Sequence, residues 1–442
     1  MMPTTAEVVD RDALIAWYLR TRARSRAIFD LVSEDAYYAR PILLRHPLVF
    51  YEGHLPAFSV NTLLKKGLGH PGIDPALETL FARGIDPDDE AAAQGAGVSA
   101  WPTRATVRHY ADEADAAILA ALARAPIVDD RVPVLRGAEA AFAIIEHEAM
   151  HQETLLYMWH RLPLDSKRAP AGYAPVVDGK APDAARVAIP AGTATLGTGP
   201  EAAFSWDNER RVHRVPVEAF EVDAFNVTNA DFMRFVEAGG YCDPKWWRAE
   251  DWAWVMSTGV THPLFWERHD GTWHWRGMFQ LVPLPGAWPA YVTYAEATAY
   301  AKWQGARLMT EAEYHRAAFG APDGGERAFP WGDAPPASSH GVFDFETWDP
   351  QPVGSRPAGA SAWGVHDLMG NGWEWTSTVF GPFDGFEPLP SYPEYSADFF
   401  DGQHYVMKGA SPVTSRDLLR RGFRNWFRPQ YPYMYASFRC AR

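Results

Sequence analysis

The sequence contains little cysteine, with only Cys242 and Cys440 among its 442 residues. Two cysteines cannot build a disulfide framework or a cysteine-rich zinc site, so catalysis by the protein's own thiols is not expected. The chain also lacks a block of lysine and arginine, and its formal net charge is −14. This charge disfavours binding to nucleic acid or to an anionic membrane, so we expect small-molecule partners.

Long apolar runs are absent as well. No stretch approaches the roughly 20 apolar residues of a membrane span, and the first residues lack the basic and then apolar pattern of a secretion signal. From these features we expect a cytoplasmic protein. Aromatic residues are abundant, with 19 Trp, 18 Tyr and 24 Phe. They favour loop-rich domains and sites that bind flat or cationic ligands.

The chain is longer than the roughly 250–300 residues at which one hydrophobic core stops growing, so two domains are expected. Long helical runs rich in Ala, Leu, Arg and Glu cover residues 11–33, 104–124 and 138–161. A fourth helix is expected to begin at Pro47 and to be perturbed at Pro56. Residues 1–165 are therefore predicted to form a four-helix bundle, followed by a Pro/Gly/Ala-rich linker over residues 166–186.

Residues 187–442 contain short apolar segments, many Gly, Pro and Trp turns, and two helix starts. Thr228 and Asp231 can cap the first of these helices, and Thr310 and Glu313 form a capping box for the second. We therefore expect a mixed, loop-dominated domain with two helices, and the predicted fold class of the whole chain is α+β.

A pair of histidines within a strongly helical pattern is the most informative local feature. His147 and His151 are four residues apart and share a helix face with Ile144, which points both imidazoles into the bundle. Their Cβ atoms are then about 5–6 Å apart, close enough to share one metal ion. His54, on the helix after Pro47, is the expected third ligand. Three imidazoles leave about three open positions on an octahedral iron(II).

Other interpretations of these histidines stay open at this level. His147-Glu148-Ala-Met-His151 also matches the His-Glu-x-x-His motif of zinc hydrolases, in which Glu148 would act as the general base. Two inward histidines can also be structural, held by hydrogen bonds. A non-catalytic module that binds a betaine or a sugar is a further alternative.

Several short motifs in a fixed order make the chain similar to the ergothioneine-type sulfoxide synthases, in which a DinB-like bundle is fused to a formylglycine-generating-enzyme-like domain. In the bundle the resemblance rests on His147-x3-His151-x-Glu153 and on the spacing from Pro47 to His54. In the second half it rests on Val187-Ala-Ile-Pro-Ala-Gly192, Asn226-Val-Thr-Asn229, Arg307-Leu-Met-Thr-Glu-Ala-Glu313, Phe329-Pro-Trp-Gly332, Gly370-Asn-Gly-Trp-Glu-Trp375 and Phe423-Arg-Asn-Trp426. The resemblance implies an O2-dependent iron(II) enzyme that uses hercynine.

The same resemblance implies roles for four residues near the end of the chain. Tyr392 corresponds to the family's catalytic tyrosine, which supplies a proton or hydrogen atom, and a phenol with a pKa near 10 stays protonated at neutral pH. Tyr395 would contact the imidazole ring of the substrate. Asn425 and Trp426 would hold its carboxylate and its trimethylammonium group, for which an indole face is suitable.

The chain departs from the family where a charged thiol donor is bound. Members that use γ-glutamylcysteine carry arginines before the third bundle helix, and Asp and Arg after the Asn-Trp pair. Here these places read Ala100-Trp101-Pro102, and Phe427 and Tyr431. The ionic clamp is missing, although Arg104 and Arg428 lie near enough in sequence to restore some charge recognition. We expect a neutral donor that stacks on Trp101, Phe427 or Tyr431.

The missing clamp favours the branch of the family that joins hercynine to a selenosugar, the selenoneine synthases, in which O2 drives C–Se bond formation. The runner-up is an ergothioneine or ovothiol sulfoxide synthase that forms a C–S bond with cysteine or γ-glutamylcysteine. A soft selenolate or thiolate is a reasonable ligand of iron in either reaction.

Overall fold

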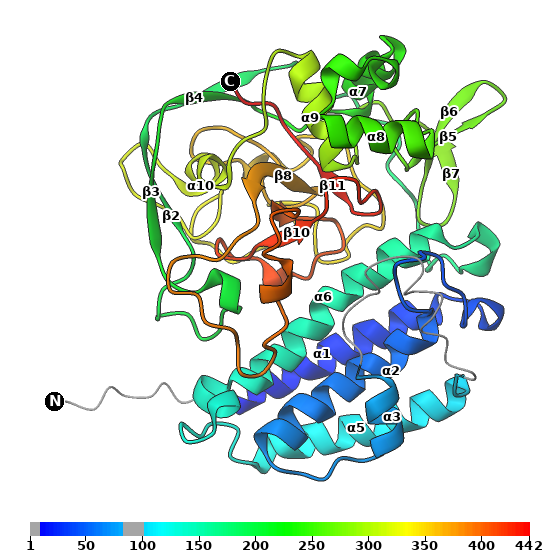
Figure 1. The fold of residues 1–442 in the computed structure, drawn as a ribbon, viewed down its shortest axis with the longest axis vertical. Coiled ribbons are helices and arrows are strands. Elements are labelled where there is room, and N and C mark those ends of the chain that lie inside the picture. Colours follow the sequence, from blue (N-terminus) through cyan, green and yellow to red (C-terminus); the bar gives the residue numbers. More distant parts are fainter. Residues whose placement is uncertain (1–8, 83–100) are drawn as a thin grey trace. The chain divides into compact units, whose positions relative to one another are not determined.

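The computed structural model describes residues 9–82 and 101–442, and the chain forms two units (Figure 1). The first unit comprises residues 1–170 together with the short segment Pro388–Pro393, and the second comprises residues 171–387 and 394–442. The first unit is helical, whereas the second combines short sheets, helices and many loops. The predicted α+β class is therefore confirmed.

Four long helices form the described part of the first unit: α1 (Arg11–Asp30), α2 (Leu48–Ser59), α5 (Arg104–Arg124) and α6 (Glu139–Arg161). Figure 1 shows them side by side, and α1 and α2 each pack against both α5 and α6. Helices α1, α5 and α6 bury Leu14, Tyr18, Ile118 and Ile144 in one apolar core, against which Phe58 of α2 packs. Burial of one such large side chain contributes about 1.5–3 kcal/mol, so this shared core holds the bundle together.

Helix α2 begins one residue later than expected. Pro47 is its N-cap residue, with φ −65° and ψ 159°, and not its first helical residue. Pro56 lies inside α2, which continues directly into the π-helical segment η2 (Val60–Gly67). Proline provides no amide hydrogen for the ladder, and wider π turns relieve such irregularities. The expected perturbation at Pro56 is therefore a change of helix type shortly after the proline.

Shorter helices fill the connections of the first unit. Helix α3 (Pro75–Leu80), which the sequence analysis does not anticipate, is capped by the Asp74 carboxylate. The 3-10 segments are η1 (Glu34–Ala36), η3 (Pro133–Ala138) and η4 (Leu164–Ser166). Because α3 follows η2, it brings Phe81, at its C-terminal end, back against α2.

The second unit contains four small sheets. Two of them are antiparallel pairs, β1 (Arg186–Ile189) with β4 (Phe220–Asp223) and β2 (Gly192–Leu196) with β3 (His213–Val217). A three-stranded sheet consists of the consecutive strands β5 (Trp266–His269), β6 (Thr272–Arg276) and β7 (Leu281–Pro283). The largest sheet has the order β10-β9-β8-β11 and consists of β8 (Gly372–Val379), β9 (Tyr405–Ala410), β10 (Asn425–Phe427) and β11 (Ala436–Ser437).

Residues 171–442, all of them described, contain four α-helices: α7 (Asn229–Glu237), α8 (Ala249–Thr258), α9 (Tyr294–Trp303) and α10 (Glu311–Phe319). Capping boxes start α7 and α10, as expected. The expectation of only two helices is wrong, because α8 and α9 also form. A Thr293–Glu296 capping box begins α9 and was visible in the sequence, whereas α8 has no side-chain cap. None of the helices in the described ranges is both long and apolar enough to cross a bilayer.

Candidate metal centre

Three histidine side chains from two helices converge inside the first unit. His54 comes from α2, and His147 and His151 come from neighbouring turns of α6. One ring nitrogen of each residue lies within 4.8 Å of the others, and the Nε2 atoms of His147 and His151 are 3.1 Å apart. Two nitrogens about 2.1 Å from one ion, at a right angle, would lie about 3.0 Å apart. The spacing therefore fits two ligands of a single metal ion.

A backbone carbonyl fixes the ring of His54. Its Nδ1 lies 2.7 Å from the carbonyl oxygen of Phe81, so Nδ1–H donates to that oxygen. The buried Nε2 has no hydrogen-bond partner among the described residues. Gly53 allows this approach, because a Cβ there would meet the Phe81 ring at 2.3 Å. A carbonyl behind an imidazole sets the tautomer that leaves the other nitrogen for a metal.

All three imidazoles are held neutral. Burial lowers the pKa of His54 to about 4. Burial is also the main reason why the pKa values of His147 and His151 lie well below their usual range, and the other histidines add to the effect. A metal binds the neutral imidazole, whose lone pair is free. Three neutral rings, those of His54 and His147 buried and that of His151 half-buried, offer nitrogens to one point and fit an ion such as iron(II).

Aromatic rings pack against the histidines. The Phe58 ring stacks on His147 with 3.6 Å between ring centroids, and the Phe50 ring stacks on His54 at 5.1 Å. Phe50 and Phe58 precede and follow His54 by four residues, so they share its helix face. Neither phenylalanine is among the residues predicted from the sequence, although their spacing of four residues from His54 is a signal that identifies both. Their stacking restricts the rotation of the ligand rings.

Tyr392 lies in the same unit, although it is far from the histidines in sequence. It belongs to the segment Pro388–Pro393, and its ring centroid lies 5.2 Å from that of Phe58 and 5.8 Å from that of His147. A phenol at this range can reach a substrate bound beside the histidines, as proton donation requires.

Trp101 also belongs to the first unit. Its ring lies parallel to that of Phe81, with centroids 6.3 Å apart, and meets the edge of Phe50 at 6.3 Å. Phe81 is the residue whose carbonyl oxygen accepts the Nδ1–H of His54, and Phe50 is the residue whose ring stacks on His54. Trp101 thus packs against two residues that themselves contact His54. Its neighbour Ala100 lies outside the described residues.

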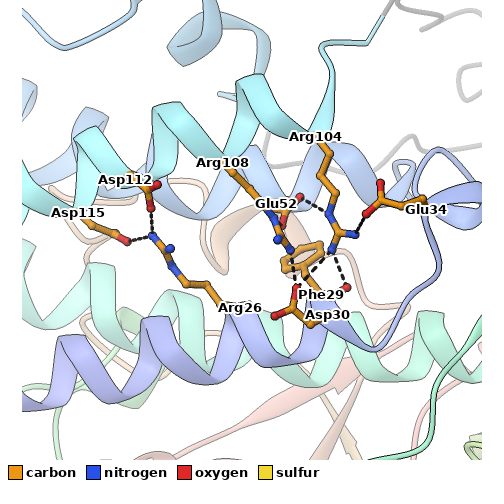
Figure 2. Close-up of polar contacts among 9 residues, drawn as sticks. All are labelled: Arg26, Phe29, Asp30, Glu34, Glu52, Arg104, Arg108, Asp112 and Asp115. Carbon is orange, nitrogen blue, oxygen red and sulfur yellow. Dashed lines mark hydrogen bonds and ion pairs between the residues drawn. The ribbon is translucent and has the colours of Figure 1, made fainter.

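The guanidinium of Arg104 is engaged within the bundle, as Figure 2 shows. It donates to Glu34 Oε1 at 2.6 Å and to the carbonyl oxygen of Phe29 at 2.8 Å, and it stacks over Tyr37. Arg108 continues this network through Glu52. The charge of Arg104 is thus already matched by acidic residues of the bundle, which argues against its recognising a charged donor.

Glu148 is occupied in a buried ion pair. Its carboxylate accepts a hydrogen bond from Arg22 of α1 at 2.9 Å, and Arg22 also donates to Asp115 at 2.8 Å. Burial raises the pKa of the Glu148 carboxyl, although Arg22 opposes the shift. A carboxylate held in this way links α6 to α1. The geometry gives no support to the zinc hydrolase alternative, which needs Glu148 as a base beside the metal.

The remaining predicted site residues lie in the second unit, and two of them share an aromatic cluster. The Trp426 ring stacks on Phe380 at 4.1 Å and meets the edge of Tyr395 at 5.3 Å. Tyr395 in turn stacks on Trp206. The side chain of Asn425 accepts a hydrogen bond from the amide of Trp426 at 2.9 Å. An aromatic cluster of this kind offers ring faces to a cationic group.

Phe427 and Tyr431 stack on each other in the second unit, with ring centroids 4.9 Å apart. Sequence analysis grouped them with Trp101 on the donor side, whereas Trp101 belongs to the first unit. The motif tryptophans Trp373 and Trp375 are 2% and 1% exposed, so they are packing residues of the core.

Comparisons with known proteins agree with this architecture. The family model described as DinB superfamily matches residues 18–155, and the one described as sulfatase-modifying factor enzyme 1-like domain matches residues 174–442. The hercynine oxygenase of Mycolicibacterium thermoresistibile is 34% identical to this chain and covers 95% of it and 92% of its own length. That of Mycobacterium tuberculosis is 34% identical, with 96% of each chain covered.

A fungal protein is also similar. The ergothioneine biosynthesis protein 1 of Schizosaccharomyces pombe is 27% identical over 93% of this chain, which spans 54% of the fungal protein. The two bacterial relatives match along nearly their whole length, and both parts of the chain match the corresponding domain families. The chain therefore belongs to the hercynine oxygenase family, which confirms the predicted enzyme class, an oxygenase with a three-histidine site.

Proposed function

We propose that this chain is an O2-dependent iron(II) enzyme that joins a thiol sulfur to the carbon between the two imidazole nitrogens of hercynine. The observation that carries the proposal is the convergence of three neutral histidines in a chain that belongs to the hercynine oxygenase family. Iron(II) held by three imidazoles supplies about three open positions on which the substrates and O2 can meet. His54, His147 and His151 would hold it.

The overall reaction balances with O2 as the oxidant. The ring C–H of hercynine and the S–H of the donor are lost, and a C–S bond forms. One oxygen atom ends on sulfur as a sulfoxide, and the other leaves as water. The protein must therefore bind both organic substrates and supply a proton at the right time, which is general acid catalysis.

Tyr392 is the proposed source of that proton. Its ring lies 5.8 Å from that of His147, and the segment that carries it belongs to the first unit. A phenol stays protonated at neutral pH, so it can donate to an oxygen atom of a reacting group without prior activation.

The betaine end of hercynine is proposed to bind residues of the second unit. The stacked rings of Trp426 and Phe380, with Tyr395 at the edge, support recognition of a trimethylammonium group through cation–π interactions. Asn425, next to Trp426, would bind the carboxylate, and Tyr395 would contact the imidazole.

For the donor, we propose cysteine or γ-glutamylcysteine first. Two relatives that match along nearly their whole length are hercynine oxygenases, and this supports the sulfur alternative better than the selenosugar branch that the sequence motifs favoured. A selenosugar is kept as the second candidate because of one observation. The charge of Arg104 is matched inside the bundle, and Trp101 and the Phe427–Tyr431 pair offer aromatic rather than ionic contacts.

A donor competition assay tests the proposal. The purified chain, loaded with iron(II), is supplied with hercynine, O2 and either cysteine, γ-glutamylcysteine or a selenosugar, and products are identified by mass spectrometry. A sulfoxide of hercynine from either thiol supports the first candidate, whereas exclusive use of the selenosugar replaces it by the second. Absence of oxygen uptake with every donor would leave only a binding module and overturn both.

A further inference from the structure

A proline-rich segment completes the first unit. The residues Pro388–Pro393 read Pro-Leu-Pro-Ser-Tyr-Pro, and they are grouped with the helical unit and not with the residues on either side of them. Within the segment, Leu389 and Ser391 are 0% and 1% exposed. Proline fixes φ, so the free segment has few conformations to lose when it packs. The segment is thus a rigid, integral part of the unit that holds the histidines.

The segment is attached to α6 by a hydrogen bond to a carboxylate. The amide of Ser391 donates to Oε1 of Glu139 at 3.0 Å. Within the segment, the amide of Tyr392 donates to the carbonyl oxygen of Leu389 at 3.1 Å, which closes a tight turn. Hydrogen bonds to an ionised acceptor are stronger than neutral ones. Because Ser391 directly precedes Tyr392, its attachment fixes the point from which the Tyr392 side chain extends.

Glu139 and two of the three histidines belong to one helix. Glu139 is the first residue of α6 and is 6% exposed, and His147 follows eight residues later on the same unbroken helix. The carboxylate that holds the segment and the imidazole that the Tyr392 ring approaches therefore keep a constant separation. A change at the start of α6 alters the position of Tyr392 without touching a histidine.

We infer that Glu139 is a positioning residue, whose carboxylate docks the Pro388–Pro393 segment so that the Tyr392 phenol lies beside the histidine site. The inference rests on the proposed role of Tyr392 as proton donor. Glu139 acts through the backbone of Ser391 and is not one of the three converging histidines. An acidic residue in the first turn also stabilises a helix, so a merely structural Glu139 would change stability and leave the turnover of the folded enzyme intact.

The test compares Glu139→Ala and Glu139→Gln with Glu113→Ala, a matched control on α5 whose side chain is 53% exposed. Glu139→Ala should lower kcat by about 10- to 100-fold, since a shift of about 1 Å at a reacting group has effects of this size. The KM for hercynine and the affinity for iron(II) should stay the same. Glu139→Gln keeps an oxygen acceptor for the Ser391 amide and should recover most of the activity, and Glu113→Ala should match the unmodified enzyme.

A double-mutant cycle with Tyr392→Phe tests whether Glu139 influences kcat through Tyr392. If Glu139 acts through Tyr392, Glu139→Ala should change kcat by less than about twofold in the Tyr392→Phe background, because coupled sites are not additive. If Glu139→Ala lowers kcat by the same factor with and without Tyr392→Phe, the inference is overturned. If Tyr392→Phe alone leaves kcat unchanged, the proposed role of Tyr392 is wrong, whatever Glu139 does.

Hydrogen exchange tests the docking without reference to activity. Prolines carry no amide hydrogen, so the segment Pro388–Pro393 offers only those of Leu389, Ser391 and Tyr392. The Ser391 amide should exchange faster in Glu139→Ala, and it should keep its protection in Glu139→Gln and Glu113→Ala. Unchanged protection in Glu139→Ala would overturn the inference even if kcat had fallen.

Discussion

The two units hold their candidate site residues by different means. In the first unit, helix periodicity directs His54, His147 and His151 to one point, and rings four residues away on α2 pack against them. In the second unit, Tyr395 and Trp426 lie on a loop and a three-residue strand, and stacking against Trp206 and Phe380 holds them. A helix fixes the relative positions of residues one turn apart, whereas the stacked cluster is held by contacts between individual rings. The first arrangement suits chemistry that needs fixed atoms, and the second suits recognition of a ligand.

The largest effect is expected from removal of one of the three histidines that the helices direct to the metal centre. His54→Ala should abolish stoichiometric iron(II) binding and lower turnover by more than about 1,000-fold, since two imidazoles hold the ion too weakly. Metal analysis of the purified variant and oxygen uptake with hercynine measure both effects. The matched control is His109→Ala on α5, whose side chain is 78% exposed. Full iron occupancy in His54→Ala would contradict the three-histidine site.

Substitution of Glu148 should lower the free energy of unfolding strongly and should change the turnover of the folded enzyme little. Glu148→Ala leaves Arg22 buried beside Asp115 alone and should cost about 3–5 kcal/mol of unfolding free energy, as for other broken buried pairs. Denaturant titration measures the loss, and kcat of the folded variant should stay within a few-fold. A collapse of kcat with unchanged stability would instead make Glu148 a catalytic base and revive the hydrolase alternative.

The stability of the metal-free protein should depend on pH through the buried histidines. The unfolded chain takes up a proton at His54 below a pKa of about 6.5, whereas the folded chain does so only near pH 4. Stability from this group is therefore complete above pH 6.5 and is lost as the pH falls towards 4. The loss is about 3 kcal/mol for a shift of this size. Denaturant midpoints across this range should vary less for His54→Leu than for His109→Ala.

Substitution of Gly53 tests whether the neighbouring residues are needed to position the ligand His54. Gly53→Ala places a Cβ where the Phe81 ring now lies, so the carbonyl that orients His54 must move. The affinity for iron(II) should fall by about 10- to 100-fold, the usual cost of losing such a partner. Gly381→Ala is the matched control, because a Cβ there meets nothing within 4 Å. Equal iron affinity in both variants would show that the Phe81 carbonyl is not needed.

The smallest effect is expected in the aromatic cluster of the second unit. Trp426→Leu removes a ring face worth about 0.5–2 kcal/mol to a bound cation, so the KM for hercynine should rise roughly 2- to 30-fold. Iron affinity should not change, and steady-state kinetics with hercynine as the varied substrate measures the shift. A loss of iron binding in this variant would contradict the division of roles between the two units.

Much of the first unit could be predicted from the sequence. Short-range patterns gave the limits of α5 and α6, the inward direction of His147 and His151, and the expectation that His54 is the third ligand. The same patterns could have identified Phe50 and Phe58. In the second unit, the Thr293–Glu296 capping box was equally readable, but α8 was not, because it lacks a side-chain cap.

By itself, the sequence determined which side chains share a helix face, because the helical repeat fixes their direction within a few residues. The tertiary structure alone decided that the Phe81 carbonyl orients His54, that Arg104 is matched by Glu34, and that the Tyr392 segment belongs to the helical unit. Each of these contacts joins residues far apart along the chain. Their formation depends on how whole helices and loops pack, which no local pattern encodes.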